Sequence, residues 1–151
     1  MVSLDDFKKI SIEDKPVFDR YYARFPPSHS GEVFTTMVSW GEYVEYRYAL
    51  IENNIVLMSK DKDGAVLHVP SGKFNLDLLK QVITLAIKEN AVFGFIKTSE
   101  KNLLAKKFPS LTFVEDRDFF DYVYRASDLA ELPGTKYGKI RNRLNKFTKN
   151  Y

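Results

Sequence analysis

The 151-residue sequence predicts an α/β domain of the α+β type, in which a mixed, mostly antiparallel sheet is flanked by helices. Segments with apolar residues at helical spacing alternate with segments rich in aromatic and β-branched residues. Three of the latter follow one another with only short turn signals between them, which indicates neighbouring antiparallel strands. The domain is expected over residues 1–133, followed by a separate basic helix over residues 134–151.

Three helices are expected within the domain. The first is signalled by Ser11 as an N-cap with Asp14 three residues later, and Pro26-Pro27 would end it. Asn75 is a good N-cap for a second helix that reaches about Glu89. A third, shorter helix is expected over residues 100–107, before Pro109.

Strands are expected over residues 43–51, 55–60 and 65–69, and residues 46–69 predict an antiparallel meander. Residues 33–40 are compatible with either a strand or a short helix. Further strands are expected over residues 92–97, 111–114 and 119–124. The helices and strands therefore alternate in an order that suits a mixed sheet better than a doubly wound parallel one.

Composition removes several classes of function. The chain contains no cysteine, which excludes disulfides, cysteine-ligated zinc and thiol catalysis. No segment approaches the roughly 20 apolar residues of a membrane span, and the N-terminus has no signal-peptide pattern. The expected location is therefore the cytoplasm. The aromatic share of 15% predicts a core rich in rings.

No sequence motif identifies a reaction, so no catalytic residue, metal ligand or cofactor is assigned. The nucleotide, P-loop, zinc-protease, serine-hydrolase and EF-hand patterns are all missing. His68 is expected to be a packed strand residue and His29 a loop residue. The acids of residues 115–121 favour a solvated turn over a cation site, and the loop of residues 69–73 is a weak anion candidate before a helix.

The basic charge is concentrated at the C-terminus. Residues 134–151 hold six of the 23 basic residues and no acid, which leaves 17 basic and 20 acidic residues in the rest of the chain. Thr135 is expected to cap this helix, and its apolar residues recur every three or four positions as one stripe. The candidate ligand- or RNA-binding residues are Lys136, Tyr137, Lys139, Arg141, Asn142, Arg143, Asn145 and Lys146.

Three interpretations of this helix stay open. Its stripe could pack on a partner domain while its charges remain in solvent. Its cations, amides and rings could instead bind RNA, including tRNA, through phosphate contacts and stacking. A third interpretation places the helix on an anionic lipid surface, which requires the apolar stripe to be free.

Several segments together resemble a known family. They are residues 120–124 (FDYVY), 128–134 (DLAELPG), 136–137 and 139 (KY and K), 141–142 (RN) and 144–147 (LNKF), with Ser30, Phe34, Trp40 and residues 68–70 upstream. They resemble proteins with a domain like the C-terminal domain of phosphatidylglycerol lysyltransferase. That family is similar to tandem GNAT-type acyltransferases and to Fem-type aminoacyl-tRNA-dependent transferases.

The resemblance implies that this chain is the N-terminal, GNAT-like half of an acyl- or aminoacyltransferase-like protein, inactive alone, with a second GNAT-like domain as its partner. The final helix would then begin the connection to that second domain. Acetyl-CoA is not expected as a cofactor, because the glycine-rich pyrophosphate loop of ordinary GNAT enzymes is missing. The alternatives are an RNA-binding module that uses the basic helix and a purely structural domain.

Overall fold

The computed structural model describes residues 1–151, apart from the side chain of Ser99. The chain forms two compact units, Met1–Val114 and Glu115–Tyr151. The first unit contains the strands β1 (Lys8–Lys9), β2 (Glu45–Ile51), β3 (Asn54–Asp61), β4 (Gly64–His68) and β5 (Val92–Gly94). Its helices are α1 (Lys15–Tyr22), α2 (Phe34–Ser39), α3 (Leu76–Lys88) and α4 (Thr98–Lys107). The second unit holds α5 (Ala126–Glu131) and α6 (Gly138–Asn150).

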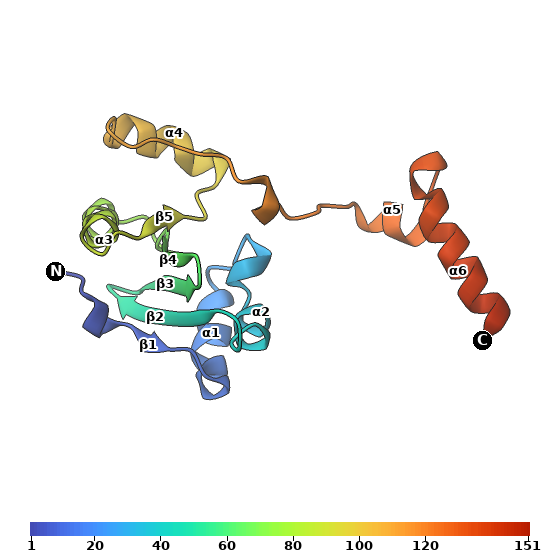
Figure 1. Cartoon of the computed structure of the whole chain (residues 1–151), viewed down its shortest axis with the longest axis horizontal. Helices are drawn as coiled ribbons and strands as arrows, with labels where there is room; N and C mark the ends of the chain where they lie inside the picture. The colour runs from blue at the N-terminus through green and yellow to red at the C-terminus, as the bar shows by residue number, and fades with distance from the viewer. The chain divides into compact units, whose positions relative to one another are not determined.

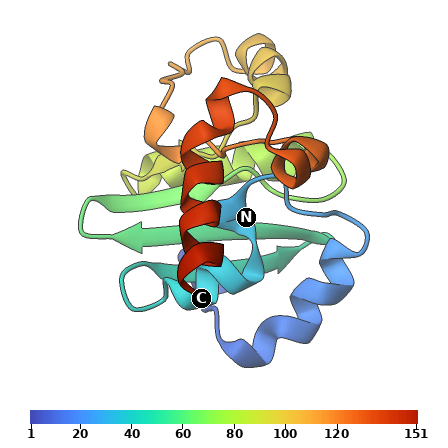
Figure 2. The same cartoon turned by 90° about the vertical axis from the view of Figure 1, so that its right-hand side faces the viewer.

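The five strands form one sheet in the order β1-β2-β3-β4-β5. Strands β1 to β4 pair antiparallel, and Figure 2 shows the long strands of the meander side by side. Strand β5 pairs parallel with β4, because α3 carries the chain back across the sheet before β5 begins. The predicted mixed, mostly antiparallel sheet with flanking helices is therefore confirmed.

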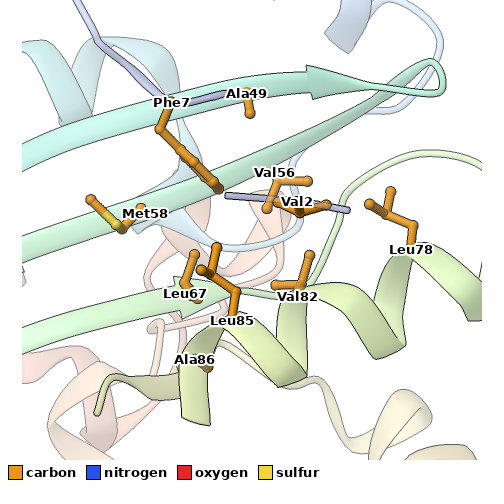
Figure 3. Close-up of a cluster of buried hydrophobic side chains, with 10 residues drawn as sticks. All are labelled: Val2, Phe7, Ala49, Val56, Met58, Leu67, Leu78, Val82, Leu85 and Ala86. Atoms are coloured by element: carbon orange, nitrogen blue, oxygen red, sulfur yellow. The ribbon is translucent and has the colours of Figure 1, made fainter. Parts of the chain in front are cut away.

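Helices cover both faces of the sheet (Figure 1). On one face, Leu78, Val82 and Leu85 of α3 point toward Val56 and Leu67 of the strands (Figure 3). The apolar residues of α3 recur at helical spacing, so burying that stripe stabilises helix and sheet together. The other face is aromatic. The rings of Phe18, Phe34 and Tyr48 from α1, α2 and β2 meet there, with centroids 4.9–5.0 Å apart.

Helix starts follow the predicted capping chemistry only in part. The Asn75 side chain accepts hydrogen bonds from the backbone N–H groups of Asp77 and Leu78, so the predicted N-cap of α3 is confirmed. Ser11 and Asp14 form a capping box, but it begins a 3-10 turn (Ile12–Asp14) that leads into α1. Helix α1 ends at Tyr22, before the prolines that were expected to end it.

Several expected strands differ in the structure. Residues 33–40 contain the short helix α2, so the strand alternative for this segment is wrong. Residues 111–114 form no strand, because Leu111 and Phe113 pack individually against the side chains between α3 and α4. Residues 119–124 also lack a strand partner, and Tyr122 and Val123 are 89% and 90% exposed. Strand β5 ends at Gly94, because Phe95 adopts a left-handed backbone conformation with φ +59°.

The starts of the C-terminal helices also differ from expectation. Helix α5 begins at Ala126, and Asp128 lies in its first turn. Thr135 is not an N-cap: it is the first residue of a 3-10 turn (Thr135–Tyr137) that precedes α6. Leu132, in the left-handed region, is the C-cap that ends α5.

Candidate functional site

The candidate site lies at the carboxyl ends of the parallel strands β4 and β5. His68 ends β4 and pairs with Gly94, which ends β5. The strands part directly afterwards: Ser71 pairs with Ile55 of β3, whereas the chain after Phe95 turns into α4. Parting parallel strands place side chains and backbone groups around one point, and ligands of open α/β sheets bind at this end of the strands.

His68 is buried with its polar ring atoms on an otherwise aromatic face. The residue is 0% exposed. Its Nε2 atom lies 3.1 Å from the Ser59 Oγ atom on the neighbouring strand β3. Its Nδ1 atom lies 3.5 Å from the Glu32 Oε1 atom and makes no hydrogen bond. Burial lowers the pKa of His68, and the Glu32 carboxylate opposes this shift. The imidazole is therefore neutral at neutral pH, although the Glu32 carboxylate lies next to it.

Two hydrogen bonds hold the backbone of Glu32 in place, one at its N–H group and one at its carbonyl oxygen. It ends a 3-10 turn (Ser30–Glu32), and its backbone N–H donates to the carbonyl oxygen of His29 at 3.0 Å. The Tyr22 hydroxyl of α1 donates to the backbone carbonyl of Glu32. The carboxylate itself is buried, so the turn fixes an acid within reach of the imidazole. Burial raises the pKa of Tyr22 far above its ordinary value, which keeps this donor protonated.

Phe95 covers the ring of His68. The two rings stack with centroids 4.2 Å apart and planes 19° from parallel. The Phe95 ring also makes an edge-to-face contact with the His29 ring, with centroids 4.8 Å apart. The two histidines of the chain, 39 positions apart in the sequence, thus contact one ring. A left-handed conformation is strained for a bulky side chain, and such residues concentrate at functional sites.

Three of the residues predicted to bind a ligand are engaged within the second unit. The Asp128 carboxylate accepts hydrogen bonds from the Lys136 ammonium and the Tyr137 hydroxyl, each at 3.1 Å. These bonds hold the pKa of Asp128 below its ordinary value, and the same contact raises the pKa of Lys136. The Arg141 guanidinium donates to the carbonyl oxygens of Leu132 and Gly134. These side chains fasten the turn between α5 and α6.

The other predicted binding residues are exposed along α6: Lys139, Asn142, Arg143, Asn145 and Lys146. Lys139, Arg143 and Lys146 are spaced four and three positions apart, so they share one face of the helix. Helix α6 contains no acidic residue that could pair with them. The structure thus separates the predicted set into a structural group and an exposed basic face.

The apolar stripe of α6 is largely exposed as well. Tyr137 is buried at the start of the helix, but Leu144 and Phe147 are 52% and 63% exposed, and Ile140 and Tyr151 are also exposed. The Phe147 and Tyr151 rings pack on each other with centroids 5.1 Å apart. The stripe therefore has a free apolar surface beside the basic face, and all three interpretations of this helix stay open.

The structure gives little support to a cation site at residues 115–121 or to an anion site in the loop of residues 69–73. Among the residues that the structure describes, no group of three or more metal-ligating side chains is gathered, and Asp116 instead caps a 3-10 turn at Asp118. In the loop before α3, the Ser71 N–H donates to the Ile55 carbonyl, and Asn75 occupies two N–H groups of the helix start. These donors are not available to an anion. No described helix is long and apolar enough to cross a membrane.

Comparison with known proteins supports the fold and assigns the family. A crystal structure of a conserved protein of unknown function from Bacteroides thetaiotaomicron VPI-5482 superimposes with a TM-score of 0.78 at 27% sequence identity. The match covers 96% of this chain and 50% of that chain, so this chain spans half the length of that protein. A search of curated proteins found no match. The chain belongs to the family “Phosphatidylglycerol lysyltransferase, C-terminal”, whose family model matches residues 22–151.

Sequence reasoning missed the partners of His68. Glu32 and Ser59 are 36 and 9 positions away in the sequence, on a 3-10 turn and another strand, and no short motif joins them. The available signal was a histidine within an apolar strand, which requires polar partners when it is buried. The register of β3 against β4 and the path of the chain before α2 select which residues those partners are.

The burial of His68 predicts a pH dependence of stability. Its folded-state pKa is lowered, so below about pH 6.5 the unfolded chain binds a proton that the folded chain excludes. The free energy of unfolding should therefore fall from pH 7 to pH 5.5, by up to about 1.4 kcal/mol per pH unit. Urea unfolding at each pH should show this fall in the native chain and in a His29→Gln control. In His68→Gln the fall should be smaller, and an unchanged fall would contradict the assignment.

Proposed function

We propose that this chain is a GNAT-like unit that forms one half of a longer acyl- or aminoacyltransferase-like protein. The observation that carries the proposal is the parallel pair β4–β5, which parts at His68 and Gly94 beside an otherwise antiparallel meander. An activated acyl ester is already reactive, so the main task of the protein is to position the ester and the group that attacks it. Strands that part at a buried imidazole supply such a place. Membership of a lysyltransferase family supports the same reaction class.

Two findings support the longer protein in the proposal. The match with this chain covers only half of the Bacteroides protein. The segment of residues 119–124 and the stripe of α6 leave rings and aliphatic groups exposed, which suits surfaces that a further domain covers. The chain alone is therefore proposed to lack part of the substrate cleft. Acetyl-CoA is not proposed as the donor, because the sequence lacks the glycine-rich loop of acetyl-CoA-binding relatives.

The test of the proposal is transfer of a labelled aminoacyl group from charged tRNA. A mixture of charged tRNAs is incubated with anionic lipid vesicles, first with this chain and then with the proposed longer protein of about twice its length, called the double-length protein below. The proposal predicts labelled, extractable lipid or another acylated acceptor only with the double-length protein. No transfer by that protein, from any charged tRNA or from an acyl thioester, would contradict it.

RNA binding is the second candidate function, and the exposed basic face of α6 favours it. Phosphate contacts by three cations give a log–log salt slope of roughly −2 to −3. Reversing two charges on this face, with Arg143→Glu and Lys146→Glu together, should weaken binding to total tRNA and flatten that slope. Arg141 is not a suitable test residue, because its guanidinium fastens the turn before α6.

A matched control reverses two exposed lysines of the first unit, Lys62→Glu and Lys101→Glu, with the same change in net charge. Filter binding across a salt series compares both double variants with the native chain. If the two variants weaken binding equally, only net charge matters and α6 is not an RNA site. Binding that does not respond to salt would also exclude this function.

A further inference from the structure

Ser59 lies where the buried part of β3 meets solvent. Residues 54–59 of this strand are buried, whereas Lys60 and Asp61 are exposed. Ser59 is 8% exposed, and its ladder partners Tyr46 and Val66 are only half-buried. The hydroxyl is therefore at the solvent border of the sheet face on which His68 is fully enclosed.

The three side chains can form one chain of proton donors and acceptors. A neutral imidazole has one N–H donor and one acceptor nitrogen. The carboxylate of Glu32 only accepts, so the proton is assigned to Nδ1, which faces Oε1 at 3.5 Å. Nε2 is then the acceptor for the Ser59 hydroxyl at 3.1 Å. Nucleophilic serines are activated by a hydrogen bond to a histidine whose other ring nitrogen faces an acid.

We propose that Ser59, His68 and Glu32 form an acyl-accepting site, in which Ser59 takes the acyl group of an activated ester before its transfer. The Ser59 Oγ atom forms a bond to the carbonyl carbon, and its proton passes to His68 Nε2. The carbon–oxygen bond of the ester breaks, and the leaving hydroxyl takes that proton from His68. An acceptor amine or hydroxyl then releases the acyl group by the reverse proton path. This inference rests on the proposed function.

Packing alone gives no reason for this cluster. Burying the unpartnered Nδ1 atom lowers stability, and an apolar side chain in the place of His68 would avoid that cost. The strained Phe95 that covers the ring adds a second local cost. Glu32 acts here as a positioning residue.

The test is covalent labelling of the chain by a fluorophosphonate, which reacts with activated serines. The proposal predicts one phosphonyl group per chain, located on Ser59 by peptide mass spectrometry. A p-nitrophenyl ester should release about one equivalent of p-nitrophenol in a burst, since the chain alone lacks the acceptor. Ser59→Ala should abolish both signals, whereas the exposed-serine control Ser39→Ala should retain them.

Variants of His68 and Glu32 test whether these two residues take part in the proton transfer. His68→Gln should slow labelling about 100-fold or more, and Glu32→Gln about 10-fold or more. Circular dichroism checks that each variant is folded; if His68→Gln unfolds, Glu32→Gln and Ser59→Ala still decide. No label on Ser59, or labelling that Glu32→Gln leaves unchanged, would overturn the proposal. If Ser59→Ala in the double-length protein still transfers the aminoacyl group, this site is wrong while the transferase function stands.

Discussion

The parallel pairing of β4 with β5 is the constraint on which the rest of the first unit depends. A parallel neighbour requires a crossover, and α3 is that crossover; its apolar stripe closes one face of the sheet. The same pairing brings the carboxyl ends of both strands to one edge, where His68 and Phe95 meet. The two strands share only three residue pairs, the last of which joins His68 and Gly94.

The opposite face shows how a ring-rich core encloses a polar group. Phe18, Phe34 and Tyr48 fill the space between the sheet and α1 and α2, and His68 continues that layer with a polar ring. Desolvation keeps His68 neutral, which suits a group that accepts and returns a proton. The second unit follows a different rule: the contact of Lys136 and Tyr137 with Asp128 fixes the turn, and α6 then presents its remaining cations outward.

Local patterns predicted the meander and α3 well, because turn residues, alternation and the Asn75 cap all act within a few positions. The patterns failed where the outcome depends on a partner strand. Residues 119–124 are rich in the aromatic and β-branched residues that favour strands, yet no neighbouring strand pairs with them in the described chain. The basic face of α6 was visible in the sequence, but the engagement of Lys136 and Arg141 was not. Glu32 and Ser59 required the three-dimensional register.

The proposed role of Ser59 depends most directly on the protonation of His68 in the folded chain. Nitrogen-15 NMR of histidine-labelled protein near pH 7, with His29→Gln to assign the signals, reports which ring nitrogen carries the proton. We expect a neutral imidazole with the proton on Nδ1, facing Glu32, and an unprotonated Nε2 that accepts from Ser59. A proton on Nε2 or a charged imidazolium at that pH would contradict it, because Ser59 would then have no base.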